Sequence, residues 1–377
     1  MSGTRRIQAV AAALRERSVD ALLVTAPANV RYLTGFSGSS GLAVIAARGA
    51  DGAGWAARDV FLTDFRYETQ AAAEVGAAAP ECERVIASGE LLAAAADLLA
   101  ERAGTAGGHA TLGFDERHLS VDAHAKLAEL LGAEIELVRG AGIVERMREV
   151  KDDEEQQRIA AAAQLADAAL AQVLETGLVG RSEREVAIDL ETRMRTLGAQ
   201  GASFPTIVAH GAHGALPHAQ PRDAEIARGS LVTIDWGAVL DGYCSDCTRT
   251  YAAGEPSELG RDVYGLVLAA QLAGVDALAP GRSGREVDAV AREVIELAGR
   301  GERFGHGLGH GVGLEVHEGP RLSRQASDEP LREGDVVTVE PGVYLPGELG
   351  VRIEDLLVVT ATASRNLSSL PKELTSL

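Results

Sequence analysis

The chain has 377 residues, 46% of them hydrophobic, and a formal net charge of −19. That length exceeds one ordinary hydrophobic core and predicts two domains, and the acidity disfavours nucleic acid and anionic membranes as partners. Because the sequence has no long uninterrupted apolar run and its basic start leads into a helical pattern, we expect neither a membrane span nor a secretory signal. The expected location is the cytoplasm.

Helical and strand-like patterns alternate through the first 140 residues. A helix is predicted over 8–17, strands over 21–26, 42–47 and 60–63, and an alanine-rich helix over 89–103. A charged segment then predicts one long helix over 145–174, at the start of a second domain. The expected domains are an α/β domain over 1–140 and a second domain over 141–377.

The second domain combines helix pairs with strand hairpins. A helix over 182–197 begins with the capping-box pattern Ser-Glu-Arg-Glu, and further helices are predicted over 259–279 and 283–298. The order helix, helix, hairpin, helix, helix, loop, hairpin implies an antiparallel sheet backed by helices. The predicted fold class is therefore α+β.

The first hairpin carries two aspartates. An apolar, β-branched run over 231–240 is followed by Asp241-Gly242 and a second strand-like run, which is a strong hairpin signal. With those two residues as the turn, Asp235 lies opposite Thr248 and shares a face with Asp246. Such a diagonal pair is separated by about 7 to 8 Å between Cα atoms, which suits two metal ions about 3.5 to 4 Å apart.

The second hairpin carries two glutamates. The strand-like run Val336-Val-Thr-Val-Glu340 is followed by a turn-rich segment and a strand over 351–359. With the turn centred near Gly347, Glu340 comes level with Glu354. Between the hairpins, a glycine-rich segment over 305–318 lets the backbone crowd a ligand while His310 supplies a nitrogen.

Together these segments predict a site for two divalent cations. A lone strand aspartate is more often a solvated surface residue, but ionised carboxylates within apolar runs are costly unless they are paired or bound to metal. Four carboxylates and one imidazole form a hard, oxygen-rich ligand set, for which we expect manganese first, with cobalt or zinc as alternatives. The five predicted ligands are Asp235, Asp246, His310, Glu340 and Glu354.

Cys244 and Cys247 form a C-x-x-C pattern around Asp246, which raises zinc or redox chemistry as an alternative. In a strand these two positions point to opposite faces, and the chain has no second pair to complete four ligands. We interpret both cysteines as packing residues.

The same segments resemble a known family. Ile-Asp-Trp-Gly-Ala, Ser-Asp-Cys-Thr-Arg-Thr, Gly-His-Gly-Leu-Gly-His-Gly-Val-Gly, Val-Glu-Pro-Gly-Val-Tyr and Val-Arg-Ile-Glu-Asp resemble the pita-bread metallopeptidases, in the branch of Xaa-Pro aminopeptidases and Xaa-Pro dipeptidases (prolidases). Two N-terminal segments, 29–38 and 62–68, look like that branch's creatinase-like amino-terminal domain. The resemblance implies a pita-bread catalytic domain and a homodimer. All five ligand positions are filled, unlike those of creatinase and the non-catalytic members.

The resemblance also implies roles for the ligands. Asp246 and Glu354 would bridge both ions, Asp235 would hold one, and His310 the other. Glu340 would be both a ligand and the proton acceptor. The two ions are expected to lower the pKa of a shared water and to polarise the scissile carbonyl.

Four further residues are candidate catalytic residues. His218 and His317 match family histidines that line the substrate pocket and contact the scissile amide or the tetrahedral intermediate, and His306 is a candidate proton relay. Arg352 either forms an ion pair with a ligand carboxylate, or orients the site or binds a substrate carboxylate. Aromatic and apolar walls for a proline ring would come from residues such as Phe204 and Tyr344.

The expected substrate is a proline-containing dipeptide or short peptide, and this specificity rests on the resemblance alone. We expect an Xaa-Pro dipeptidase slightly ahead of an Xaa-Pro aminopeptidase. Two alternatives stay open: a non-catalytic binding protein on the same fold, and a binuclear hydrolase of another substrate, such as an amidase or a phosphatase. The shorter methionine-specific members are disfavoured because they lack the N-terminal domain.

Overall fold

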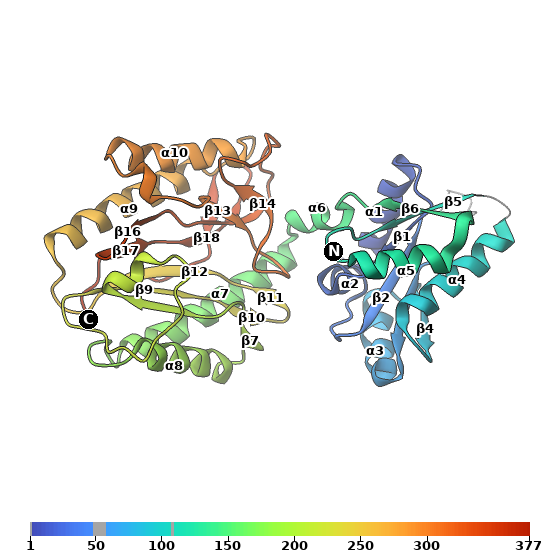
Figure 1. Cartoon of the computed structure of the whole chain (residues 1–377), viewed down its shortest axis with the longest axis horizontal. Helices are drawn as coiled ribbons and strands as arrows, with labels where there is room; N and C mark the ends of the chain where they lie inside the picture. The colour runs from blue at the N-terminus through green and yellow to red at the C-terminus, as the bar shows by residue number, and fades with distance from the viewer. Residues whose placement is uncertain (1, 48–57, 107–108) are drawn as a thin grey trace. The chain divides into compact units, whose positions relative to one another are not determined.

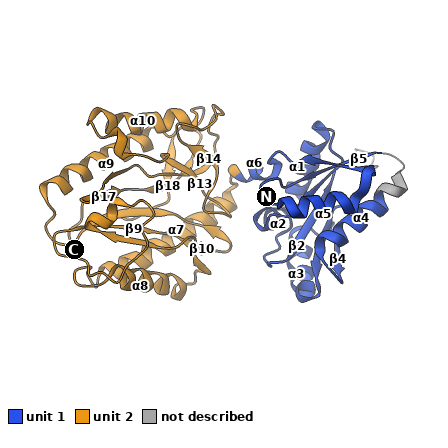
Figure 2. Cartoon of the chain, in the orientation of Figure 1, with its two compact units in different colours: residues 1–148 blue, residues 149–377 orange. Residues whose placement is uncertain are grey.

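The structure is a computed structural model that describes residues 2–47, 58–106 and 109–377. The chain forms two compact units, Met1–Arg148 and Glu149–Leu377 (Figure 2). We expected a boundary near residue 140; the division lies just beyond it, within the short helix α6 (Ile143–Glu149). In the described part of the chain, no helix has both the length and the apolarity needed to cross a bilayer.

The first unit is a six-stranded mixed sheet with helices, in the strand order β4-β3-β2-β1-β5-β6 (Figure 1). The pairs β3–β4, β1–β5 and β5–β6 are parallel, and β1–β2 and β2–β3 are antiparallel. The strands are β1 (Ala21–Val24), β2 (Gly41–Ala46), β3 (Val60–Asp64), β4 (Glu83–Ala87), β5 (Ala110–Phe114) and β6 (Ile135–Arg139). The helices before α6 are α1 (Gly3–Glu16), α2 (Pro27–Thr34), α3 (Glu68–Ala78), α4 (Leu91–Ala106) and α5 (Val121–Leu131). The expected α/β character of this region is confirmed.

Two helices replace the single long helix that was predicted over 145–174. Helix α6 ends at Glu149, and α7 (Asp153–Leu174) begins after Asp152, whose side chain caps it in a capping box with Glu155. Between them, Val150 forms an antiparallel bridge to Asp335. The prediction of one continuous helix was wrong because this pairing draws the backbone into an extended conformation, which the helical pattern of the sequence does not reveal.

The second unit contains two helix pairs, α7 with α8 (Glu183–Thr196) and α9 (Glu258–Ala277) with α10 (Gly284–Leu297). The strands lie between the two pairs (Figure 1). One core packs α9 and α10 against the second predicted hairpin, and another packs α7 and α8 against the first. Helices therefore back an antiparallel arrangement of strands, as the sequence predicted.

These strands form four small sheets, ordered β11-β10-β7, β12-β9-β8, β14-β13-β15-β18-β19 and β16-β17. The strands of the first half are β7 (Gly201–Ala202), β8 (Ile207–His210), β9 (Leu231–Trp236), β10 (Ala238–Leu240), β11 (Tyr243–Cys244) and β12 (Cys247–Ala252). Those of the second half are β13 (Gly309–Gly311), β14 (Glu318–Leu322), β15 (Val336–Val339), β16 (Gly342–Leu345), β17 (Leu349–Arg352), β18 (Asp355–Val359) and β19 (Ser364–Asn366). Each hairpin is thus interrupted next to a predicted metal ligand.

The predicted register of the first hairpin is confirmed. Asp241 and Gly242 form its turn with positive φ angles of 49° and 78°, the backbone that a tight two-residue hairpin turn requires. Thr248 pairs with Asp235. Because side chains alternate between the two faces of a strand, this register decides which face carries Asp235.

The register of the second hairpin is confirmed as well. Val339 pairs with Asp355 on one side of the interruption, and Gly342 pairs with Arg352 on the other. The same register on both sides places Glu340 level with Glu354. The turn is centred on Gly347, whose φ is 80°.

Candidate metal centre

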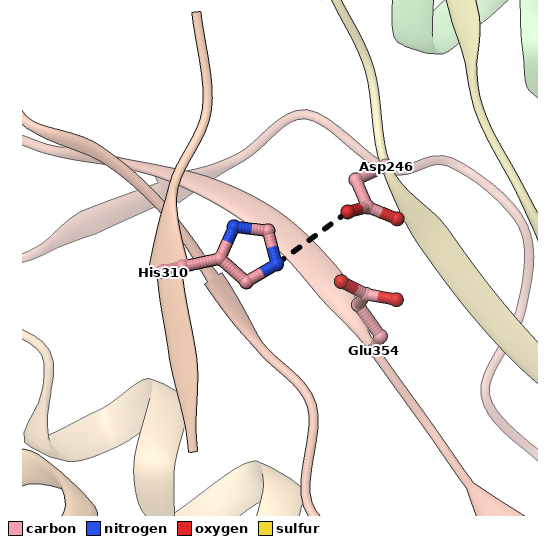
Figure 3. Close-up of side chains that lie close together, drawn as sticks. All are labelled: Asp246, His310 and Glu354. Atoms are coloured by element: carbon pink, nitrogen blue, oxygen red, sulfur yellow. Dashed lines mark ion pairs between the residues drawn. The ribbon is translucent and has the colours of Figure 1, made fainter. Parts of the chain in front are cut away.

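Three of the five predicted ligands converge tightly. Ligand atoms of Asp246, His310 and Glu354 all lie within 4.8 Å of one another, and the three side chains face a common point (Figure 3). Asp246 lies between β11 and β12, His310 in β13, and Glu354 between β17 and β18. His310 Nε2 lies 3.6 Å from Asp246 Oδ2. Both hairpins and the glycine-rich segment therefore contribute to one cluster.

Glu340 joins this cluster through His310. Its Oε1 lies 3.3 Å from His310 Nε2 and accepts a hydrogen bond of 3.2 Å from Thr338 Oγ1. Thr338 Oγ1 also accepts a hydrogen bond from the backbone N–H of His310, at 3.1 Å. Thr338 is thus bonded both to the backbone of His310 and to the carboxylate of Glu340.

The glycines on either side of His310 allow strands to approach closely. A Cβ atom at Gly309 would lie 2.0 Å from the carbonyl oxygen of Thr338, and one at Gly311 would lie 1.9 Å from that of Gly319. Neither position has room for a side chain. The glycine-rich pattern therefore brings His310 against the strand that leads to Glu340.

Asp235 is held beside the cluster by Arg352. Arg352 Nη2 lies 2.6 Å from Asp235 Oδ2, and both side chains are almost fully buried. Arg352 Nε donates to Thr248 Oγ1 at 3.0 Å, and Thr248 in turn donates to Glu354 Oε2 at 2.7 Å. Of the two roles considered for Arg352, the geometry supports the ion pair with a ligand carboxylate.

The negative charges of the clustered carboxylates repel one another and shift their pKa values. Burial raises the pKa of Asp246 well above its usual range, and the charges of Glu354, Asp235 and Glu340 raise it further. Burial and the charge of Glu340 do the same to the pKa of Glu354. For Glu340, burial acts in the same direction, but the hydrogen bond and charge of His310 outweigh it and lower the pKa.

Two buried oxygens in the cluster have no hydrogen-bond partner: Asp235 Oδ1 and Glu354 Oε1. A buried carboxylate oxygen without a donor is costly, so such atoms call for a cation. Oxygen ligands with one imidazole suit hard or borderline divalent metals. The residues present therefore fit a divalent metal site.

His306 lies behind the ligands in a hydrogen-bond chain. Its Nδ1–H donates to the carbonyl of Gly307 at 2.7 Å, so its Nε2 is free to accept from the hydroxyl of Tyr344 at 2.9 Å. The same hydroxyl accepts from Arg352 Nη1 at 2.9 Å. Burial lowers the pKa of His306, which favours this neutral form. His306 is thus linked to Asp235 through Tyr344 and Arg352.

His218 and His317 lie on the exposed side of the cluster. The rings of His317 and His310 are 4.3 Å apart between centroids. Burial lowers the pKa of His317, as do the charges of His310 and, to a smaller extent, His218. His317 therefore lies next to the cluster, and His218 is linked to it through the neighbouring Pro217, whose carbonyl oxygen accepts from Arg352.

Cys244 and Cys247 are buried and not joined by a disulfide. Cys247 Sγ donates to the carbonyl oxygen of Glu354 at 3.2 Å, and burial raises the pKa of its thiol well above the usual range. This environment favours an unreactive thiol that packs against the backbone of Glu354.

Sequence reasoning missed the contributions of Thr248, Thr338 and Tyr344 to this network. A signal was available for Thr248, because the predicted register places it opposite Asp235. Tyr344 was considered only as a pocket wall, and its hydroxyl instead links Arg352 to His306.

Comparison with known proteins agrees with this geometry. Residues 157–361 match the model of metallopeptidase family M24, and residues 6–150 match that of the creatinase/prolidase N-terminal domain. A peptidase of Bacillus subtilis without an assigned function, YqhT, is 42% identical over 94% of this chain and 95% of its own length. The Xaa-Pro dipeptidase of Pyrococcus furiosus is 44% identical over 62% of this chain and 66% of its own length.

Two solved structures cover nearly the whole chain. The Xaa-Pro dipeptidase from Bacillus anthracis is 39% identical, with a TM-score of 0.90 and full coverage of both chains. The X-Pro aminopeptidase from Thermotoga maritima is 34% identical, with a TM-score of 0.82 and coverage of 96% of this chain and 99% of that one.

Proposed function

The chain belongs to metallopeptidase family M24, and we propose that it hydrolyses the Xaa-Pro bond of proline-containing dipeptides, with the N-terminal Xaa-Pro bond of short peptides as the alternative substrate. The observation that carries the proposal is the cluster of Asp246, His310 and Glu354, with Glu340 next to His310 and with two unpartnered buried carboxylate oxygens, Asp235 Oδ1 and Glu354 Oε1. Xaa-Pro dipeptidase is preferred over Xaa-Pro aminopeptidase, because the dipeptidase structure has the higher identity and TM-score of the two.

The metal ligands in this proposal are Asp235, Asp246, His310, Glu340 and Glu354, which would hold two divalent ions. Manganese is the first candidate, with cobalt or zinc as alternatives. When bound, such ions lower the pKa of water and polarise a carbonyl oxygen.

The side chains of the protein divide the remaining work. Glu340 accepts the proton of the attacking water at a carboxylate oxygen, the role that the family resemblance implies. His218 and His317 donate hydrogen bonds to the substrate from the exposed side of the cluster. Arg352 keeps Asp235 oriented, and His306 supports Arg352 through Tyr344.

A homodimer in the cytoplasm completes the proposal. Support for both comes from the family resemblance and from the acidic composition without a predicted membrane span. Light scattering coupled to size-exclusion chromatography tests the dimer, and cell fractionation tests the location.

The deciding experiment removes metal with a chelator and restores manganese, cobalt or zinc separately. Hydrolysis of Ala-Pro, Ala-Pro-Pro and Ala-Ala is then measured, with the Asp246→Asn variant as a control. We expect metal-dependent cleavage of Ala-Pro only. Cleavage of Ala-Pro-Pro would instead assign an aminopeptidase, and cleavage of Ala-Ala at an equal rate would remove the proline preference. No cleavage with any metal would overturn the proposal and favour a binding protein or another hydrolase.

A further inference from the structure

A second buried carboxylate, Glu183, lies outside the ligand set at the first residue of α8. Its side chain is fully buried, yet it accepts hydrogen bonds from three residues. His210 donates from its backbone N–H at 3.0 Å and from Nδ1 at 2.8 Å, and His213 Nδ1 donates at 2.9 Å. Arg222 donates from its backbone N–H at 3.0 Å and from Nε and Nη2, each at 3.1 Å.

These donors lie at the two ends of one chain segment, 210–222. His210 and His213 lie at its start and Arg222 at its end, so the carboxylate of Glu183 is bonded to both ends of the segment. The segment begins at His210, the last residue of β8, and continues as a 3₁₀ helix (η3, Gly211–Ala215) followed by turns and irregular backbone. His218 lies in the middle of this segment.

The segment also touches the metal centre between those ends. The carbonyl oxygen of Pro217, next to His218, accepts a hydrogen bond of 3.2 Å from Arg352 Nη1. Gly350 packs so closely on Gly214 that a Cβ atom at Gly350 would lie 1.8 Å from the Gly214 oxygen. Small displacements of the segment are therefore transmitted to the position of His218.

The charge of Glu183 matters as well as its shape. Burial acts to raise its pKa, but the hydrogen bonds from Arg222, His210 and His213 outweigh burial and hold the pKa at about 2. An ionised carboxylate offers two oxygens that only accept, whereas the amide of glutamine would turn an NH2 group toward the same donors. The isosteric change Glu183→Gln therefore loosens the segment while leaving its volume unchanged.

We propose that Glu183 is a positioning residue for His218: it closes the segment 210–222 around its carboxylate and so holds His218 at the exposed side of the metal centre. This inference rests on the proposed function of His218. The competing explanation is that Glu183 only stabilises the N-terminus of α8.

The test compares Glu183→Gln with Glu185→Gln. Glu185 belongs to the same helix terminus, where it completes the capping box with Ser182, but it makes no contact with 210–222 among the described hydrogen bonds. With manganese restored and metal content measured, we expect Glu183→Gln to lower kcat and kcat/KM for Ala-Pro by the same factor, about 10- to 100-fold. Glu185→Gln should leave both close to the wild-type values.

A double-mutant cycle with His218→Ala separates positioning from general stability. If Glu183 acts through His218, Glu183→Gln should change kcat less than about twofold once His218 is already alanine. An unchanged reduction in the His218→Ala background would overturn the proposal, as would equal effects of Glu183→Gln and Glu185→Gln.

Milder variants cover the case in which Glu183→Gln does not fold. His213→Ala removes one donor, and His213→Asn restores an NH donor near the position of Nδ1. We expect a partial loss of kcat in the first and recovery in the second, and equal activities would contradict the proposal.

Hydrogen exchange provides a readout that needs no substrate. Amide exchange over 211–221 should be faster in His213→Ala, and in Glu183→Gln where it folds, but not in Glu185→Gln. Unchanged exchange would overturn the positioning role even if the wild type cleaves no Xaa-Pro bond, so the two proposals fail separately.

Discussion

Two regions of the second unit bury carboxylates in opposite ways. Glu183 is surrounded by donors from three residues, and its pKa is about 2. Asp246 and Glu354 instead face other carboxylates, and their pKa values are raised well above the usual range. Burial is common to both regions. The two regions differ in the groups that face the buried carboxylate: hydrogen-bond donors at Glu183, and further carboxylates at Asp246 and Glu354.

A third buried acid, Asp115 in the first unit, falls between these extremes. Its Oδ2 accepts from the backbone N–H groups of Thr25 and Ala26 at 2.8 and 2.9 Å. Burial outweighs these two bonds, and the charge of Glu145 adds to it, so the pKa of Asp115 is about 6. The pKa of a buried carboxylate thus follows the donors that surround it.

The largest expected effect is the loss of activity when Asp246, which faces other carboxylates, is changed to asparagine. Asp246→Asn should lower kcat/KM for Ala-Pro by about 1,000-fold or more, equal to about 4 kcal/mol of transition-state stabilisation, because the change removes one of the proposed metal ligands. Steady-state kinetics and metal analysis of the dialysed protein measure it. Glu286→Gln, at the capping box of α10, is the control. Activity within tenfold of the wild type would argue against Asp246 as a ligand.

In the metal-free protein, replacing the acid by its amide should change the free energy of unfolding in opposite directions at Glu183 and at Glu354. Glu183→Gln should cost about 2 to 3 kcal/mol, because hydrogen bonds to an ionised group are lost. Glu354→Gln should stabilise the metal-free protein by about 1 kcal/mol, because it replaces an acid whose ionised form is disfavoured by burial and by the charges of Glu340 and Asp235. Thermal unfolding in the presence of a chelator measures both changes in stability. Changes of the same sign would contradict the proposed difference between the two buried acids.

Adding metal should stabilise the wild type by about as much as Glu183→Gln destabilises it. A ligand at 100 times its Kd stabilises a protein by about 2.7 kcal/mol. We expect manganese to raise the Tm of the wild type and to have little effect on Asp246→Asn. Magnesium at the same ionic strength controls for salt, and an equal shift in both proteins would indicate binding elsewhere.

The smallest effect concerns the pH dependence of the first unit. The pKa of folded Asp115, about 6, lies above its unfolded value, so its contribution to stability is complete below about pH 4 and is lost as the pH rises through 6. Asp115→Asn, in which one amide oxygen replaces Oδ2, should remove about 1 to 2 kcal/mol of that pH dependence. Urea unfolding at pH 4, 6 and 7 measures the free energy of unfolding of both proteins. If this free energy changes with pH in Asp115→Asn as much as in the wild type, Asp115 is not the cause of the pH dependence.

Local patterns predicted the parts of the fold that depend on alternation and turns. Asp241-Gly242 and the segment around Gly347 determine the register of both hairpins, and register decides which residues share a face. The convergence of Asp246, His310 and Glu354 follows from those hairpins and from the glycines beside His310. The two pairs of helices were likewise visible as helical patterns.

What local patterns did not predict depends on distant partners. The break between α6 and α7 comes from the pairing of Val150 with Asp335, far along the chain. The donors of Glu183 come from residues 27 to 39 positions away, and its own sequence context reads only as a helix start. Tyr344 and His306 likewise meet across 38 positions. No periodicity in the sequence records such contacts.

Arg352 contacts both halves of the second unit. From β17 it reaches Asp235 and Thr248 of the other hairpin, as well as Pro217. The two halves are therefore joined by hydrogen bonds from a single side chain. Loss of this guanidinium would remove all three bonds at once, so one substitution would disturb both Asp235 and the backbone next to His218.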